Sequence, residues 1–293
     1  MASALAGGVA FYRHPSAAMQ QVLRLRLLLS GASERTVNVG GLPVRYFESL
    51  PEAPQRGQET FVLVHGFGDS AETWSLVLPE LRNEGRVLAP DLAGFGRTPT
   101  PQEGMSFSVL TDYLGRFLDA VSVRKAVLVG NSLGGAVVIR YAADHPDRVS
   151  HLFLLDSAGL HAGATIAATQ PETREAARET VKAVAGKNLD VPRFVLDDIV
   201  RRGKDPARQE YRDSDEPTDV SEYLPRIKSP TTIVWGERDG LIPTEHGARM
   251  RDAIDDSELI VLPDVGHVPQ LQASKRLLEI IRERLGRLGL RGG

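Results

Sequence analysis

The sequence of 293 residues contains no cysteine. This absence excludes disulfide bonds, thiolate zinc sites and a cysteine nucleophile, but it does not distinguish a reducing from an oxidising compartment. Long apolar runs are absent too. The longest one near the N-terminus, residues 22–29, is interrupted by Arg24 and Arg26 and falls short of the roughly 20 residues that span a bilayer. Residues 1–10 lack the basic start of a secretory signal. We therefore expect a cytoplasmic protein.

A strong excess of either charge is also absent, since the formal net charge is −3. A chain without a basic surplus gives no reason to expect a nucleic-acid partner. Hydrophobic residues make up 42% of the chain and charged residues 25%, which is ordinary for a globular protein with a sizeable core. Nucleic acid is therefore not an expected partner, and the small-molecule partner that we do expect rests on sequence motifs instead of on charge.

The first 35 residues depart from this balance. Four arginines face a single acidic residue, Glu34, and residues 16–29 are rich in leucine. Two interpretations of residues 16–29 stay open. They form a helix that docks on the protein or joins two copies as a dimer, or they form a helix that lies on an anionic membrane surface. In the second case the cytoplasmic protein is peripheral to a membrane.

The most informative stretch is residues 126–143. Residues 126–129 are an apolar run typical of a strand buried on both faces. Residues 133–143 are small and apolar, as in a packed helix. Between them stands Gly130-Asn131-Ser132-Leu133-Gly134. A sharp strand-to-helix turn strains its central residue, and glycines two positions away on either side remove side chains that would collide. The pattern predicts that Ser132 presents its hydroxyl at the carboxyl end of a strand.

Strand-like apolar runs alternate with helix-like stretches through most of the chain. This alternation predicts an α/β fold with a mostly parallel central sheet and helices on both faces. Residues 157–229 interrupt it, because they lack a convincing buried strand and contain charged, helix-like pieces at 172–184, 191–202 and 220–227. We therefore expect a helical N-terminal segment at 1–35, a core domain formed by 36–156 and 230–293, and a helical cap at 157–229. Further expected elements are strands at 36–39 and 44–47 and helices at 71–81 and 270–285.

Five motifs resemble those of the α/β-hydrolase superfamily, and the resemblance covers nearly all of the chain from residue 36 onward. They are His65-Gly66-Phe67-Gly68, Asp91-Leu-Ala-Gly-Phe-Gly-Arg-Thr98, the turn at residues 130–134, Trp235-Gly-Glu-Arg-Asp239 and Asp264-Val-Gly-His267. The chain order serine, aspartate, histidine is also the order of this superfamily. The resemblance implies the α/β-hydrolase fold.

The resemblance also implies a catalytic triad of Ser132, Asp239 and His267. A serine hydroxyl is a weak nucleophile, so His267 would take its proton as general base, and Asp239 would hold the imidazole tautomer. The two backbone N–H donors of the superfamily's oxyanion hole map to Phe67 and Leu133. Asp156 is a rival to Asp239, because it also ends a strand and some members take their acid from that strand.

Other residues are expected to shape the site. The turn glycines are Gly66, Gly130 and Gly134, and the candidates for the pocket are His65, Asn131, Trp74 and Val268. His65 is expected to order the oxyanion loop more than to perform chemistry, and Trp74 is equally compatible with the core and with a pocket wall. No metal and no organic cofactor is implied, because proton transfer and covalent acylation need neither.

Within the superfamily, the chain resembles bacterial carboxylesterases, lipases and monoacylglycerol-lipase-like proteins, through residues 65–74, residues 154–160 and the leucine-rich N-terminal segment. We expect a serine hydrolase for carboxylic esters. The charged cap differs from an apolar lipase lid and favours small to medium acyl chains or monoacylglycerols.

Two alternatives stay open. One is a carbon–carbon bond hydrolase of meta-cleavage-type diketones. Such enzymes usually have Gly-Pro-Gly after the His-Gly of the oxyanion loop and an aromatic residue after the histidine, where this chain has Val268. The other is a non-catalytic, ligand-binding protein with the same fold, which the complete set of triad residues disfavours.

Overall fold

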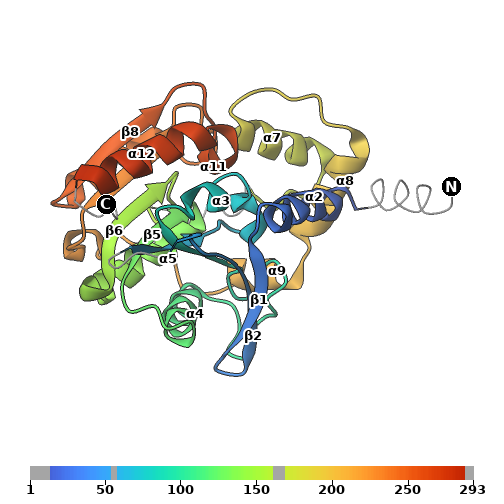
Figure 1. Ribbon diagram of the computed structural model, residues 1–293. Coiled ribbons are helices and arrows are strands. Elements are labelled where there is room, and N and C mark those ends of the chain that lie inside the picture. The colour runs from blue at the N-terminus through green and yellow to red at the C-terminus, as the bar shows by residue number, and fades with distance from the viewer. Residues whose placement is uncertain (1–13, 54–57, 161–168, 288–293) are drawn as a thin grey trace.

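A sheet of eight strands forms the centre of the molecule, with helices on both faces (Figure 1). The computed structural model describes residues 14–53, 58–160 and 169–287. The strands are β1 Ser33–Val39, β2 Leu42–Ser49, β3 Glu59–Val64, β4 Gly85–Pro90, β5 Ala126–Asn131, β6 Val149–Leu155, β7 Thr231–Gly236 and β8 Ser257–Leu262. Their order is β1-β2-β4-β3-β5-β6-β7-β8. Strand β2 is antiparallel to β1 and β4, and the other neighbouring pairs are parallel. The predicted mostly parallel α/β sheet is confirmed.

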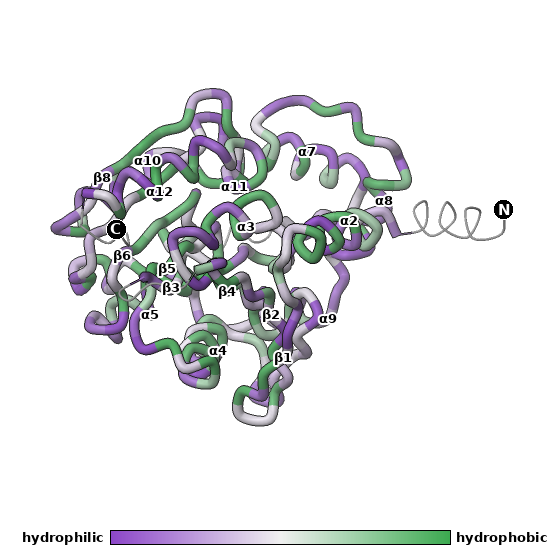
Figure 2. The backbone as a smooth tube through the Cα atoms, viewed as in Figure 1, coloured by the Kyte–Doolittle hydropathy of each residue, from purple (hydrophilic) through white to green (hydrophobic). Residues whose placement is uncertain are grey.

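The helices bury apolar side chains against both faces of this sheet. The α-helices are α2 Pro15–Leu29, α3 Leu78–Leu81, α4 Phe107–Ala120, α5 Leu133–Asp144, α7 Arg174–Ala185, α8 Arg193–Gly203, α9 Pro206–Arg212, α10 Thr244–Ala253, α11 Pro269–Gln272 and α12 Ser274–Arg287, and the 3₁₀ turns are η1 Ala71–Trp74, η2 Pro146–Arg148 and η3 Leu224–Arg226. Successive residues of a strand point to opposite faces. Val62 accordingly joins the apolar cluster under α4, α5 and α10, and Phe61 joins the cluster under α2, α3 and α12. Hydrophobic residues therefore dominate the central strands. In outer helices such as α12, hydrophobic and hydrophilic residues alternate along the chain (Figure 2).

Prolines break two of the expected helices. Residues 71–81 form η1 and the short α3, because Pro79 has no N–H to donate to the carbonyl of Ser75. That oxygen instead accepts from Nε of Arg26 in α2 at 3.3 Å. Residues 220–227 contain only η3, with Pro225 near its start. The expected helix at 270–285 is divided into α11 and α12.

The start of the sheet and the number of cap helices also differ from the expectation. β1 begins at Ser33, so the last residues of the expected N-terminal segment 1–35 belong to the sheet. In the expected cap, α7 and α8 lie close to their predicted positions, but α9 was missed. Its start signal was present in the sequence, since Asp205 caps the helix by accepting from the N–H of Ala207 at 3.1 Å and Pro206 follows. The limits of the cap as a unit stay a prediction, and residues 161–168 lie outside the described residues.

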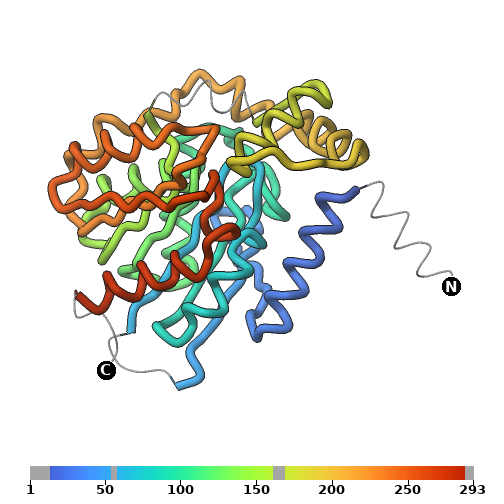
Figure 3. Tube along the Cα trace, turned by 90° about the horizontal axis from the view of Figure 1, so that it is seen from above, coloured from blue at the N-terminus to red at the C-terminus, as the bar shows by residue number. Residues whose placement is uncertain are grey.

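Helix α2 lies beside η1 and the cap helix α8 (Figure 3). The N–H of Ser16 donates to Oδ2 of Asp198 in α8 at 2.8 Å. The inner face buries Leu27, while the outer face exposes a stripe of large apolar side chains, Met19, Val22, Leu25 and Leu29. No helix within the described residues has the length and apolar character needed to cross a membrane. Contact of residues 16–29 with a membrane surface or a second copy stays a prediction. A Val22→Ser variant tests this prediction. If the wild type co-sediments with liposomes or forms a dimer, the substitution should weaken that association.

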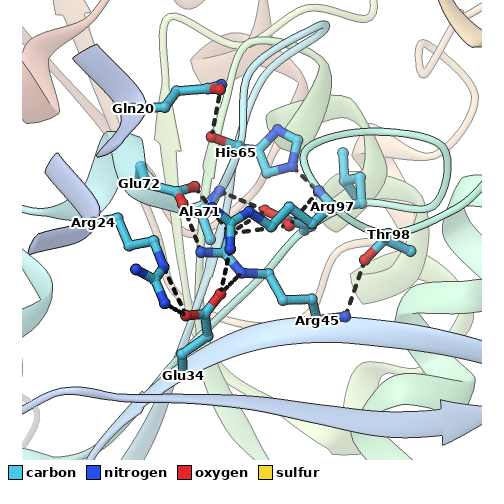
Figure 4. A network of polar contacts seen from close by, with 12 residues as sticks. Gln20, Arg24, Glu34, Arg45, His65, Ala71, Glu72, Arg97 and Thr98 are labelled. Atoms are coloured by element: carbon cyan, nitrogen blue, oxygen red, sulfur yellow. Dashed lines mark hydrogen bonds and ion pairs between the residues drawn. The ribbon is translucent and has the colours of Figure 1, made fainter. Parts of the chain in front are cut away.

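A buried arginine ties the antiparallel edge of the sheet to the loop after β3 (Figure 4). Arg45 in β2 is only 4% exposed. Its guanidinium donates to both carboxylate oxygens of Glu72, at 2.6 and 2.9 Å, and contacts Asp91 at 3.1 Å and Glu34 at 2.8 Å. Asp91 also accepts from the N–H of Ala71 at 2.8 Å. The network thereby holds η1, which follows the loop after β3, against β2 and the end of β4.

Replacing Arg45 with methionine is expected to lower the free energy of unfolding by about 3–5 kcal/mol, because two or more carboxylates would stay buried without their cation. Urea denaturation measures this. The matched control is Arg35→Met, which removes a 51% exposed partner of Glu48 and should cost no more than about 1 kcal/mol. Equal losses in the two variants would contradict a structural role for the buried network.

Candidate active site

Ser132 occupies a strained turn at the end of the central strand β5. Its φ is 54° and its ψ is −120°, and α5 begins at the next residue. Neighbouring backbone leaves no room for side chains beside it. A Cβ on Gly134 would lie 2.3 Å from the carbonyl oxygen of Val64, and one on Gly130 would lie 2.5 Å from that of Gly134. The glycine positions of the predicted turn are therefore required by close backbone contact.

Two backbone N–H groups beside Ser132 are free. Within the described part of the chain, no acceptor is bonded to the N–H of Leu133, the first residue of α5, or to that of Phe67 in the loop after β3. This loop lies directly over the serine, since a Cβ on Gly66 would lie 3.1 Å from Cβ of Ser132. Backbone N–H groups that have no acceptor and belong to segments next to a serine are the kind of donor that a developing oxyanion needs.

His267 is oriented by Asp239. Nδ1 of the imidazole is 2.7 Å from Oδ2 of Asp239, and both side chains are buried. The second oxygen, Oδ1, accepts from the N–H groups of Leu241 at 2.8 Å and Ile242 at 3.1 Å. Because a carboxylate oxygen accepts hydrogen bonds, Nδ1 of the ring donates to Asp239 and Nε2 is left without this partner.

Ser132 and His267 are joined indirectly. Nδ2 of Asn131 donates to the carbonyl of His267 and to that of Leu155, both at 3.1 Å. Oδ1 of Asn131 accepts from Nε2 of Gln270 at 3.0 Å. A direct bond between the Ser132 hydroxyl and the imidazole is not among those formed by the described residues. Without substrate such bonds are often long and shorten in the complex. Asn131 thus positions the histidine loop on the serine turn instead of lining a pocket.

The C-terminal end of the cap helix α7 is bonded to the two loops that carry Asp239 and His267. The last carbonyls of a helix have no partner inside it. Here the carbonyl of Ala183 accepts from the N–H of Gly240 at 3.0 Å, and that of Val184 accepts from the N–H of His267 at 2.9 Å. The cap therefore helps to define where Asp239 and His267 sit.

Similarity to known proteins agrees with this arrangement. A model of the alpha/beta hydrolase family matches residues 61–280.

The chain belongs to the alpha/beta hydrolase family.

Two relatives carry different names. This chain is 30% identical, over 250 residues, to the 2-hydroxy-6-oxo-6-(2'-aminophenyl)hexa-2,4-dienoic acid hydrolase of Metapseudomonas resinovorans. The match covers 80% of this chain and 84% of that protein. The chain is 28% identical, over 232 residues, to Lipase 1 of Psychrobacter immobilis, covering 73% of each. Among solved structures, that of a membrane phospholipase A, described as a bacterial virulence factor, is similar with a TM-score of 0.78 and 26% identity, over 99% of this chain and 96% of that one. These similarities support hydrolase activity and leave the substrate class open.

The rival acid, Asp156, lies beside the same pair. It directly follows β6, has a φ of 44° and is fully buried. One ligand atom each of Asp156, Asp239 and His267 lies within 4.8 Å of the others. Oδ1 of Asp156 accepts from the N–H of Gly236 at 2.8 Å, and no donor among the described residues reaches Oδ2. Burial, and secondly the negative charge of Asp239, raise the pKa of the Asp156 carboxyl well above its usual range. The hydrolase therefore holds a neutral acid next to the carboxylate that binds the imidazole.

This raised pKa predicts a pH-dependent stability. Folded hydrolase retains the Asp156 proton at pH values where the unfolded chain has released it, so this group lowers stability as pH rises above about 4. Asn resembles the protonated acid and does not titrate. Asp156→Asn is therefore expected to gain stability relative to the wild type between pH 5 and pH 8, by at most about 1.4 kcal/mol per pH unit. Urea unfolding at both pH values measures the difference. The exposed Asp255→Asn serves as control, and a pH-independent difference would refute a buried neutral Asp156.

The remaining predicted pocket residues have different positions. His65 is fully buried. Its Nε2 accepts from the N–H of Leu92 at 2.9 Å and its Nδ1 lies 2.8 Å from the carbonyl of Gly66, which fits a role in ordering the oxyanion loop. Trp74 is 0% exposed and packs in the cluster under α2, α3 and α12, so of the two positions expected for it, core and pocket wall, it occupies the core. Val268 is half-buried beside the histidine.

Several contributors were not predicted. Gln270 bonds to Asn131, and Oε1 of Gln272 accepts from the N–H groups of Gly266 at 3.1 Å and Val268 at 3.3 Å, on both sides of His267. Glutamines in a helix-like stretch look like solvated surface in a single sequence. No local signal distinguishes these two, since their partners are set by tertiary contact.

Proposed function

We propose that this hydrolase cleaves carboxylic esters through a covalent acyl-enzyme, with Ser132 as nucleophile, His267 as general base and Asp239 as the group that orients it. The hydrogen bond from Nδ1 of His267 to Asp239, at 2.7 Å, carries the proposal. It leaves Nε2 free to take the serine proton, which is the task of the base in acyl transfer.

The steps follow from these positions. The hydroxyl oxygen of Ser132 attacks the ester carbonyl while Nε2 of His267 takes the proton. The N–H groups of Phe67 and Leu133 donate to the tetrahedral oxyanion. His267 then passes the proton to the leaving alcohol oxygen as the carbon–oxygen bond breaks. Water attacks the acyl-enzyme in the same way, which releases the acid and restores Ser132.

Small to medium acyl esters or monoacylglycerols are the proposed substrates. The lipase and phospholipase relatives support an ester, and the charged cap argues against bulk fat. The relative named as a dienoic acid hydrolase supports the second candidate, cleavage of a carbon–carbon bond in a meta-cleavage-type diketone. The loop Phe67-Gly68 and Val268 count against that candidate, since they depart from the pattern of those enzymes.

An ester panel tests the proposal. We expect turnover of 4-nitrophenyl butyrate and monobutyrylglycerol, lower turnover of 4-nitrophenyl palmitate, and little of emulsified triolein. Turnover of a 2-hydroxy-6-oxo-dienoic acid above that of every ester would instead establish the carbon–carbon hydrolase. A protein that turns over neither class and resists a fluorophosphonate probe would be a ligand-binding member of the family.

A further inference from the structure

Two arginines of the cap converge on the oxyanion loop. Nη2 of Arg202, in α8, donates to the carbonyl oxygen of Gly68 at 3.0 Å, and Nη2 of Arg208, in α9, donates to the same oxygen. The second guanidinium rests on the loop where a side chain would stand, since a Cβ on Gly68 would lie 2.5 Å from Cζ of Arg208. One neutral oxygen is thus shared by two cations.

Neither arginine forms an ion pair. No carboxylate of the described residues lies within ion-pair distance of either guanidinium, and residues 1–13, 54–57, 161–168 and 288–293 contain no aspartate or glutamate. Neighbouring cap arginines are paired: Arg201 with Asp198, and Arg212 with Asp213. Arg178 and Arg193 are unpaired as well, but they are exposed to solvent, so among the described cap arginines only Arg202 and Arg208 are both half-buried and without an ion pair.

The local environment disfavours two unpaired cations. Both side chains are half-buried. Burial lowers the pKa of both, and burial followed by the charge of Arg202 lowers the pKa of Arg208 to about 10. The negative charges of Asp69 and Asp205, which lie beyond ion-pair distance, raise the pKa of both arginines and offset part of this lowering. Partly desolvated charges of one sign become more stable when an anion binds between them.

The pair also lies beside the proposed reaction centre. Cζ of Arg208 is 6.0 Å from the ring centroid of Phe67, whose backbone N–H is the proposed oxyanion donor. Gly68 is two residues beyond Gly66, which contacts Ser132, and two residues span at most about 8 Å between Cα atoms. An anionic group bound by the arginines is therefore one short chain away from an ester carbonyl at Ser132.

We propose that Arg202 and Arg208 form a binding site for an oxyanionic group of the substrate, a carboxylate or a phosphate, held beside the ester bond. The inference rests on the proposed ester hydrolysis and specifies its substrate class. Guanidinium groups match carboxylates and phosphates because their N–H donors form a planar fork. The competing interpretation is a purely structural clamp that fastens the cap to the loop through Gly68.

Matched substrate pairs separate these interpretations. 4-Nitrophenyl butyrate ends in a methyl group where mono-4-nitrophenyl succinate carries a carboxylate. Likewise, 1-butyrylglycerol lacks the phosphate of 1-butyrylglycerol 3-phosphate. The first pair tests a carboxylate on the acyl side, and the second tests a phosphate on the alcohol side.

We expect the wild-type kcat/KM to be about tenfold or more higher for the anionic member of at least one pair. In Arg202→Gln and Arg208→Gln this ratio should fall about 10- to 100-fold, mainly through KM, which is the size of effect expected when a charged hydrogen bond is lost. Arg201→Gln, on the same helix but paired with Asp198, should keep the ratio. Melting temperatures of all variants confirm folding.

Two results would overturn the anion site. One is a wild-type ratio near one for both pairs. The other is an equal loss for both members of a pair in Arg202→Gln or Arg208→Gln, as a clamp requires. If the wild type cleaves no ester at all, the proposed function fails separately. The anion site is then decided by calorimetric titration of the wild type and Arg208→Gln with succinate and with glycerol 3-phosphate. Binding that the substitution abolishes supports the site, and absence of binding refutes it.

Discussion

Replacing Ser132 with alanine is expected to lower kcat for 4-nitrophenyl butyrate roughly 10⁴- to 10⁶-fold, to the level that binding and the oxyanion donors alone support. The substitution removes the only atom that the mechanism acylates. It leaves the backbone donors of Phe67 and Leu133 in place, so substrate affinity should change little. Initial rates with active-site titration measure the effect.

The control must separate chemistry from backbone strain. Ser122 is a second serine in a left-handed conformation, with a φ of 58° against 54° for Ser132, but it lies exposed beyond α4. Ser122→Ala should therefore retain wild-type kcat and fluorophosphonate labelling, while Ser132→Ala loses both. Similar rates in the wild type and Ser132→Ala would exclude the acyl-enzyme mechanism.

Replacing Asp239 with asparagine is expected to lower kcat by about 10³- to 10⁴-fold. The loss follows from the hydrogen bonds at this position. Oδ1 of Asp239 already accepts from the N–H groups of Leu241 and Ile242. An asparagine would keep its carbonyl there and turn its NH₂ toward His267. Nδ1 would then have to accept, the proton would move to Nε2, and the ring could no longer take the Ser132 proton.

Asp156 supplies the matched control and a second test. Asp156→Asn keeps a donor next to Asp239 and should retain kcat within about tenfold. Burial and, secondly, the charge of Asp239 raise the pKa of Asp156, so Asp239→Asn removes the second cause and makes ionisation of Asp156 near the imidazole easier. The double variant should therefore be less active than Asp239→Asn alone. A larger loss from Asp156→Asn than from Asp239→Asn would make Asp156 the catalytic acid.

The structure separates what is encoded locally from what depends on the whole chain. Residues 126–143 encode the serine turn locally. They contain an apolar strand, glycines at the positions where neighbouring backbone leaves no room for a Cβ, and a helix of small residues. The strained Ser132 follows from these neighbours, and the parallel sheet follows from repeated strand and helix units. The break in the expected helix at 71–81 has a local cause as well, since Pro79 lacks the N–H that a continuous helix requires.

Contacts between distant segments were not readable. Asn131 lies 136 residues from His267, whose carbonyl it binds, and no property of either residue indicates that pairing. The arginines of α8 and α9 look like solvated surface in a charged stretch until folding places them on Gly68. Trp74 could be assigned to the core only once α2, α3 and α12 were seen to cover it.

The sequence by itself determined the fold and the order of the residues proposed for catalysis, because strand periodicity, proline and glycine act over a few neighbouring residues. Only the tertiary structure decided which carboxylate binds the imidazole, which N–H groups have no acceptor among the described residues, and that two half-buried cap arginines lie against one carbonyl without an ion pair. Those outcomes depend on hydrogen bonds, burial and charge proximity between segments far apart in the chain, and such quantities exist only after folding.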